Sequence, residues 1–150
     1  MTPEEIKNII APCGLCCETC FAHVEGDIRH LAVKLKEKLG NFHINAKRFE
    51  TLLGDPVFKK YGQFKAMLDY FSSEHCAGCR KEQCKIFPDC GVRPCTQQKN
   101  LDFCWQCDEF PCDKTQFDPV LVKGWILMNE KIRDIGIEAY AKKARTRLRY

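Results

Sequence analysis

Twelve cysteines in 150 residues constrain this chain more than any other feature of its sequence. Eight of them lie between residues 76 and 112, in a stretch that holds few aliphatic side chains. Such a segment cannot bury enough apolar surface to form a core of its own, so its fold depends on what the sulfur atoms bind. The chemistry of the cysteines therefore decides how the middle of the chain folds.

The N-terminal sequence indicates the surroundings in which these thiols work. Met1, Thr2 and Pro3 are followed by two acids, where a secretory signal would be cationic, and no apolar segment or small-residue cleavage site comes next. We therefore predict a cytoplasmic protein, in which reducing conditions keep thiols from pairing as disulfides. No apolar run approaches the roughly 18 residues of a membrane span, so we expect no membrane partner.

The spacing of the cysteines is typical of metal ligands. Cys-x2-Cys units begin at residues 13, 17, 76 and 104. A two-residue gap allows a tight turn to aim both sulfurs at one ion about 2.3 Å away, while backbone N–H groups donate to the thiolates. Four such units, in a chain without the βαβ pattern of a thioredoxin, predict metal binding.

Two pairings of the cysteines stay open at this point. In a sequential pairing, the cysteines at 76, 79, 90 and 95 share one ion, and those at 104, 107 and 112 share another with an N-terminal thiol. In a cross-brace pairing, Cys13 and Cys16 meet Cys104 and Cys107, which joins the N-terminal helices to the cysteine-rich segment.

Zinc and an iron–sulfur cluster both accept four thiolates. Cys13, Cys16 and Cys20 have the compact spacing that a [4Fe–4S] cluster would accept, but neither the bacterial ferredoxin run nor the plant-type spacing is present. We therefore expect two or three Zn²⁺ ions in closed, structural sites. An iron–sulfur protein or a thiol-based redox sensor is the alternative, and the vicinal Cys17 is expected to pack on the core side of its turn.

Outside the cysteine-rich segment the patterning is helical. Thr2, Pro3 and Glu5 form the capping box of a short helix that Pro12 ends. Apolar residues at helical spacing predict an amphipathic helix from residue 28 to 39, closed by Gly40. A weaker helix is expected over 46–53 and a stronger one over 56–71, and both are expected to contribute to the core.

The last helices are predicted from the same signals. Asp118 and Pro119 begin a helix with an apolar stripe from Leu121 to Ile135, and after a break at Gly136 a short basic helix follows. We predict a mainly α fold with little or no β structure. It is expected to be one domain, residues 1–150, with helical parts at 1–75 and 113–150 around a loop-rich, metal-binding segment at 76–112.

The cysteine motifs resemble those of a known family. The runs APCGLCCETC (11–20), CAGCR (76–80), CGVRPC (90–95) and FCWQCDEFPC (103–112) are similar to those of small bacterial and archaeal cysteine-rich proteins, a family of unknown function presumed to bind zinc. The run IRDIGIEAY (132–140) is similar to the helical tail of that family. The resemblance covers nearly the whole chain and implies no reaction. It implies that the metal ligands are Cys13, Cys16, Cys20, Cys76, Cys79, Cys90, Cys95, Cys104, Cys107 and Cys112, and it leaves Cys17 and Cys84 unassigned.

The sequence favours a non-catalytic recognition module over an enzyme. A catalytic zinc ion keeps an open position and a nearby general base, and no His-Glu-x-x-His unit is present. The only His-x-Glu, at His23 and Glu25, follows its Cys-x2-Cys unit, whereas the zinc deaminase signature has the reverse order. We expect a protein partner whose identity the sequence leaves open.

A nucleic acid is the alternative partner. Zinc knuckles could act together with the basic C-terminal helix, although the formal charge of +4 gives no further support. Four thiolates around one Zn²⁺ leave a charge of about −2, so two such sites would cancel that excess. The basic residues in question are Lys142, Lys143, Arg145, Arg147 and Arg149.

Overall fold

The computed structural model describes residues 1–150 and contains helices but no β-sheet. Strand-like pairing is limited to two isolated bridges, Ile10 with Cys16 and His23 with Cys76. The predicted mainly α fold is therefore confirmed. The helical elements are α1 (Pro3–Ile9), α2 (Asp27–Leu39), α3 (Phe42–Leu53), the 3₁₀ turn η1 (Pro56–Lys60), α4 (Tyr61–Ser72), α5 (Val92–Gln98), the 3₁₀ turn η2 (Cys104–Gln106), α6 (Pro119–Ile135) and α7 (Ile137–Thr146).

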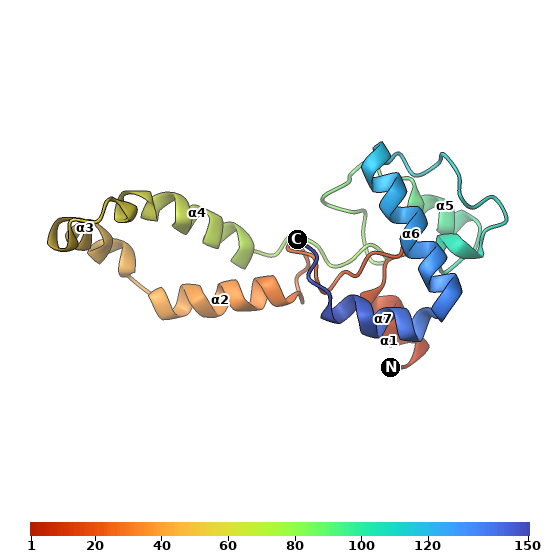
Figure 1. The fold of residues 1–150 in the computed structure, drawn as a ribbon, viewed down its shortest axis with the longest axis horizontal. Coiled ribbons are helices and arrows are strands. Elements are labelled where there is room, and N and C mark those ends of the chain that lie inside the picture. Colours follow the sequence, from red (N-terminus) through yellow and green to blue (C-terminus); the bar gives the residue numbers. More distant parts are fainter.

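The elements divide between a projecting arm and a body (Figure 1). The arm comprises residues 27–72: α2 leads away from the body, α3 and η1 form the tip, and α4 returns along α2. The body comprises residues 1–26 and 73–150, with α1 and α7 side by side and α6 packed on η2. None of these helices has both the length and the apolar character needed to cross a membrane.

Several helix boundaries follow the predicted capping signals. The Thr2 side chain accepts a hydrogen bond from the backbone of Glu5, whose carboxylate accepts one in return, so the capping box of α1 is present. Asp118 accepts hydrogen bonds from the first turn of α6, and Gly136 ends that helix with φ of 80°. The segment expected as one helix from residue 56 begins instead as η1, a tighter turn that places Phe58 against Phe42 and Phe49.

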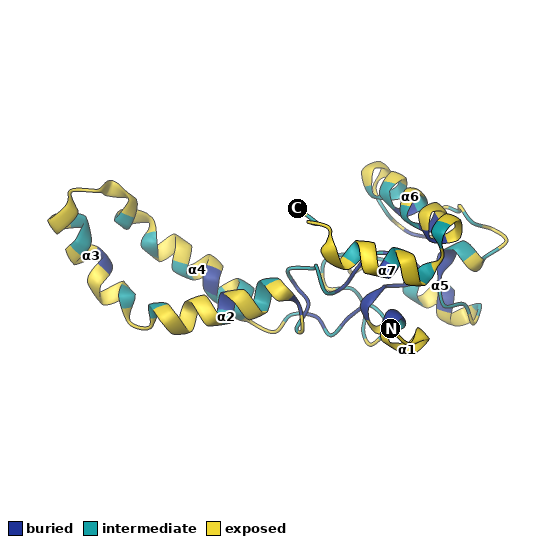
Figure 2. Cartoon of the chain, turned by 60° about the horizontal axis from the view of Figure 1, so that its bottom comes forward, coloured by how far each residue is buried: buried dark blue, intermediate teal, exposed yellow.

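The arm contributes less to the core than the sequence predicted. Ala32, Ala46 and Leu68 are its only buried side chains, whereas Leu52 and Leu53 remain 61% and 64% exposed. Figure 2 shows the outer faces of α2, α3 and α4 largely exposed. A helical hairpin standing alone has one internal seam, so apolar side chains that point away from the seam have nothing to pack on. The expectation that the two helices over 46–71 build core is therefore met only by Ala46 and Leu68.

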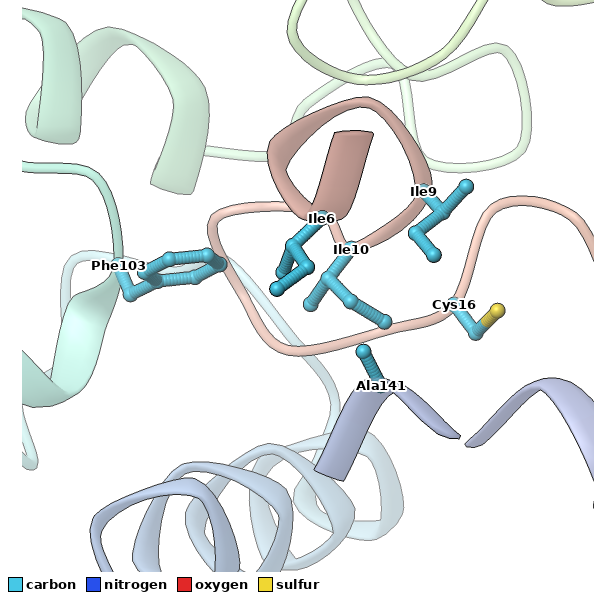
Figure 3. Close-up of a cluster of buried hydrophobic side chains, with 6 residues drawn as sticks. All are labelled: Ile6, Ile9, Ile10, Cys16, Phe103 and Ala141. Atoms are coloured by element: carbon cyan, nitrogen blue, oxygen red, sulfur yellow. The ribbon is translucent and has the colours of Figure 1, made fainter. Parts of the chain in front are cut away.

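The core lies in the body and joins segments that are distant in sequence. In Figure 3, the side chains of Ile6 and Ile10 from α1 and the following turn meet Phe103 and, across from them, Ala141 of α7. A second cluster, centred on the fully buried Trp125 of α6, contains buried cysteines. Its buried members are Ala11, Cys13, Cys17, Val92, Cys104 and Trp125.

The cysteine-rich segment shares these two clusters with its flanks. It forms no separate core, as the sequence predicted, but Val92, Phe103 and Cys104 are buried against residues from both ends of the chain. The short helix α5 inside it was not predicted. Only Val92 and Thr96 of α5 are buried, and two positions are too few to produce a helical periodicity in the sequence.

Candidate metal centre

Four cysteines from the C-terminal half of the cysteine-rich segment line one cavity, here called cavity 1. Its volume is about 20 Å³, which is room for a single atom of water size. The sulfur-bearing walls come from α5, from η2 and from the loop before α6, and the indole of Trp125 closes one side. The cysteines of cavity 1 are Cys95, Cys104, Cys107 and Cys112.

A second cavity of about 20 Å³, here called cavity 2, lies between the N-terminal turn and the first half of the same segment. Its apolar walls include Leu15, Phe87 and Phe117. The cysteines of cavity 2 are Cys13, Cys79, Cys84 and Cys90.

The Gly78 N–H donates to Cys76 Sγ at 3.4 Å. Backbone N–H groups two or three residues further along the chain also lie close to four other cysteine sulfurs and favour their anionic forms. These groups are Leu15 for Cys13, Glu18 and Thr19 for Cys16, Ile86 and Phe87 for Cys84, and Val92 and Arg93 for Cys90. This pattern is the one that the tight turns of metal knuckles produce. Because an N–H donor stabilises sulfur more when it is an anion, these turns favour thiolates.

Side-chain donors are present around cavity 1. The Lys99 ammonium group donates to Cys107 Sγ at 3.3 Å and is held in place by Glu109 at 2.6 Å. The buried indole Nε1 of Trp125 has no regular hydrogen-bond partner, and the sulfur of Cys104 is the acceptor beside it. A thiolate at Cys104 would satisfy that N–H, since an anion accepts a stronger hydrogen bond than a neutral thiol.

The pKa values of the thiols differ with their surroundings. Burial raises the pKa of Cys104 to about 12 and raises that of Cys13 further. Hydrogen bonds with the Cys79 thiol lower the pKa of Cys17 to about 7 and that of Cys84 to about 6, and raise the pKa of Cys79 itself. Buried thiols with raised pKa values stay neutral unless a bound cation stabilises their anions.

The cysteines are all free thiols, and no three His, Cys, Asp or Glu side chains converge as the ligands of a bound ion would. Each cavity therefore brings its sulfurs into one space, but the sulfurs do not converge on a common point.

The structure separates the ten cysteines implied by the resemblance into three groups. Cavity 1 takes four of them, and cavity 2 takes Cys13, Cys79 and Cys90. The remaining three line neither cavity: Cys16 packs on the α1 cluster, Cys20 lies beside the Tyr150 phenol, and Cys76 pairs with the backbone of His23. Cys104 and Cys107 share a cavity with Cys95 and Cys112, a grouping that neither open pairing contained.

Asn129 was missed by the sequence reasoning. It is fully buried on α6, where its Nδ2 donates to the carbonyls of Cys13 at 2.8 Å and Trp125 at 2.9 Å, and its Oδ1 accepts from the backbone N–H of Trp105 at 3.1 Å. The available signal was a polar residue placed four positions after Trp125 and three before Ile132, inside an apolar stripe.

The family assignment agrees with this arrangement of cysteines. The model of a family described as "Protein of unknown function (DUF3795)" matches residues 9–117. The chain belongs to this family. The matched region contains all twelve cysteines and therefore both cavities' sulfurs, whereas α6, which supplies Trp125 and Asn129, follows it. No curated protein and no solved structure matches the chain.

Proposed function

We propose that this DUF3795 protein is a cytoplasmic, non-catalytic recognition module whose body is held together by structural Zn²⁺. The observation that carries the proposal is cavity 1, where four cysteines from three consecutive segments line a space for one atom. A closed set of four thiolates is the usual ligand set of structural zinc, which contributes folding energy and leaves no position open for chemistry.

The chemistry around cavity 1 suits a thiolate-bound cation. The Lys99 ammonium and the unpartnered Trp125 indole N–H both lie beside its sulfurs, and each would interact more strongly with a thiolate than with a thiol. The volume of about 20 Å³ accepts one ion. Because neither ferredoxin spacing is present in the sequence, we prefer zinc to the iron–sulfur alternative.

Zinc would supply stability that apolar packing in this region does not. The loops around cavity 1 carry only Val92, Thr96, Phe103, Cys104 and Thr115 as buried side chains. A structural zinc site contributes on the order of 10–16 kcal/mol of apparent binding free energy, which is folding free energy when the unfolded chain has no site. The proposed ion would therefore dominate the stability of residues 92–115.

The test is the metal content of protein purified without oxygen, measured by elemental analysis together with an absorption spectrum. We expect bound zinc, no visible absorption, and loss of one zinc equivalent in Cys104→Ser. Cys20→Ser is the matched comparison and should keep its zinc, because the Cys20 thiol lines neither cavity. Bound iron with visible colour, or a native protein without metal, would contradict the proposal.

The arm is the surface that we propose for partner recognition. Leu52 and Leu53, which are adjacent at the end of α3, are each more than 60% exposed, as is Leu31 of α2, and exposed apolar side chains of this kind are the contacts that we propose for a partner. Residues 27–74 hold nine Lys and Arg against six Asp and Glu, so the fitting partner is a protein with an apolar groove bordered by acids.

The basic tail supports a nucleic-acid partner less well, because two of its three arginines contact the body. Arg145 pairs with Glu18 at 2.6 Å, and Arg149 donates to the carbonyl of Cys16 at 3.1 Å.

A photoreactive residue at Leu52 should crosslink a protein in cells, whereas the same residue at the exposed Val120 of the body should not. Loss of that crosslink in Lys47→Glu would confirm the charge requirement. Equal crosslinking from both positions would contradict recognition through the arm.

A further inference from the structure

The two cysteines that sequence reasoning left over meet a third cysteine in the structure. The Cys79 thiol lies close to both Cys17 and Cys84, and its interaction with them lowers the pKa of each of these two thiols. The three thiols come from different segments: the N-terminal turn, the Cys-x2-Cys unit at residue 76, and the loop that follows it. Three neighbouring thiols brought together from separate loops are the first requirement of a thiolate site.

A fourth cysteine, Cys90, lies next to this group. Cys79, Cys84 and Cys90 line cavity 2, whose volume of about 20 Å³ accepts one atom, and Cys17, which does not line it, belongs to the buried cluster against which Cys79 and Cys90 pack. Backbone N–H groups of the residues two and three positions further on lie close to the sulfurs of Cys84 and Cys90 and favour their anionic forms. These donors are fixed by the backbone and stand ready for anionic sulfur.

Two arginines supply positive charge to this group. Arg149 lies near enough to Cys17 and Cys84 to stabilise both as anions, and its guanidinium is anchored on the carbonyl of Cys16. Arg80 also interacts with Cys17 and is held by the carbonyls of Lys7, at 2.6 Å, and Asp102, at 2.9 Å. Four thiolates and a divalent cation carry a charge of about −2, which two arginines balance.

We infer that Cys17, Cys79, Cys84 and Cys90 form a second site for a single thiophilic divalent cation such as Zn²⁺, separate from cavity 1. The inference rests on the proposed function only in that both require metal binding. It assigns ligand roles to Cys17 and Cys84 and joins the N-terminal turn to the cysteine-rich segment through the metal.

The bound ion would join the turn after α1 to the loop at residues 80–91. Cys17 lies in the turn directly after α1, where its own backbone N–H donates to the carbonyl of Ile9 at 2.6 Å. Cys84 and Cys90 lie within a loop without helices, residues 80–91. An ion shared among them fixes this loop on α1 and on the apolar walls of cavity 2, where Leu15, Phe87 and Phe117 would exclude water from the thiolates.

The experiment titrates the full-length, reduced chain with Zn²⁺ and, in parallel, with Co²⁺, whose sulfur-to-metal charge-transfer absorption reports thiolate ligands. We expect two ions per chain in the wild-type protein and one in Cys84→Ser and in Cys17→Ser. Cys95→Ser, which alters cavity 1 alone, should also retain one ion. The double variant Cys84→Ser with Cys95→Ser should retain none.

The outcomes separate this inference from the proposed function. A wild-type protein without any ion defeats the proposed function. A wild-type protein with ions, whose number is unchanged in Cys84→Ser and Cys17→Ser, overturns the second site and leaves cavity 1 standing. Where Cys84→Ser fails to fold, Cys84→His keeps a zinc ligand at that position. It should then bind two Co²⁺ with reduced charge-transfer absorption, and an unaltered spectrum would likewise overturn the assignment.

Discussion

Asn129 shows how a single polar side chain fixes the relative positions of three segments. Its amide connects α6 to the turn at Cys13 and to η2 at Trp105, and all three hydrogen bonds are buried or partly buried. An amide is suited to this role because it donates and accepts at once. Both cavities depend on segments that Asn129 holds, since Cys13 lines cavity 2 and Cys104 precedes Trp105.

Replacing Asn129 by Ala should lower the free energy of unfolding by about 1–3 kcal/mol, since the Cys13 carbonyl and the Trp105 N–H lose their buried partners. Chemical denaturation of the metal-loaded protein measures the change. Glu130→Ala is the matched control, because Glu130 is the next residue of the same helix and is exposed. Equal stability of the two variants would show that Asn129 has no such role.

Tyr140 connects α7 to the N-terminal turn. Its phenol donates to the carbonyl of Gly14 at 2.8 Å, and burial raises its pKa to about 12 from an ordinary value of 10. Because the folded state disfavours the phenolate, this contribution to stability is complete below pH 10 and is lost as the pH rises toward about 12.

Tyr140→Phe should therefore be less stable than the wild-type protein by about 0.5–1.5 kcal/mol at neutral pH, the net worth of one hydrogen bond. The difference in melting temperature between the two proteins should shrink as the pH rises from 9 to 11. Thermal unfolding across this range measures it. A difference that stays constant with pH would mean that Tyr140 does not titrate as its burial requires.

The loop before α6 packs with its backbone directly against the start of α5. A Cβ built on Gly91 would lie 2.0 Å from the carbonyl oxygen of Lys114, and the Gly91 N–H donates to the Thr115 carbonyl at 3.1 Å. Gly91 begins α5, and Lys114 and Thr115 line cavity 1. The absence of a side chain at residue 91 therefore allows α5 to approach the loop that closes the cavity.

Gly91→Ala should separate α5 from this loop, lower the melting temperature and weaken Zn²⁺ binding at cavity 1 by tenfold or more, equivalent to about 1.4 kcal/mol. Gly124→Ala is the control, since a Cβ there meets nothing within 4 Å and Ala is favoured inside a helix. It should stabilise α6 by about 0.5–1 kcal/mol. Competition with a zinc chelator measures the affinities, and unchanged affinity in Gly91→Ala would contradict this account.

The helices that local signals specify could be predicted, and the packing of the arm could not. Thr2, Asp118 and Gly136 act within a few residues of the termini they define, so their effect is visible in the sequence. The apolar residues Leu52 and Leu53 have the spacing of a buried helix face, but burial needs a second surface, and periodicity does not show whether one exists.

The same distinction applies to the candidate site. Cysteine spacing predicted metal-ligand chemistry, and the N–H donors to Cys13, Cys16 and Cys76 are the local consequence of that spacing. The grouping of Cys95 with Cys104 and the meeting of Cys17 with Cys79 depend on how loops fold over one another, which spacing does not encode.

On the scale of the whole molecule, the arm and the cavities are separate. No residue of the arm lines either cavity. The two segments that connect the arm to the body are held together, since the Val24 N–H donates to the Cys76 carbonyl at 2.9 Å and Arg29 pairs with Glu74 at 3.2 Å. The body therefore holds the base of the arm closed without help from its tip.

A variant in which residues 27–73 are replaced by a short Gly-Ser linker should fold and bind the same number of Zn²⁺ ions as the full chain. Its far-UV circular dichroism should lose the contribution of α2, α3 and α4. Elemental analysis and circular dichroism measure the two expectations. Loss of metal in this variant would mean that the arm supports the cavities through contacts beyond its base.

A small rotation at the junction of arm and body would move the tip of the arm by a larger distance. At this junction, here called the pivot, the Phe21 ring lies among Tyr70, Phe71 and Tyr150, with centroids 6.0–6.2 Å away. Because α2 has 13 residues and is about 20 Å long, a rotation of about 10° at the pivot displaces the far end by about 3 Å. Phe21 directly follows Cys20, so a small readjustment of the cysteine-bearing turn would be amplified into a reorientation of the apolar tip.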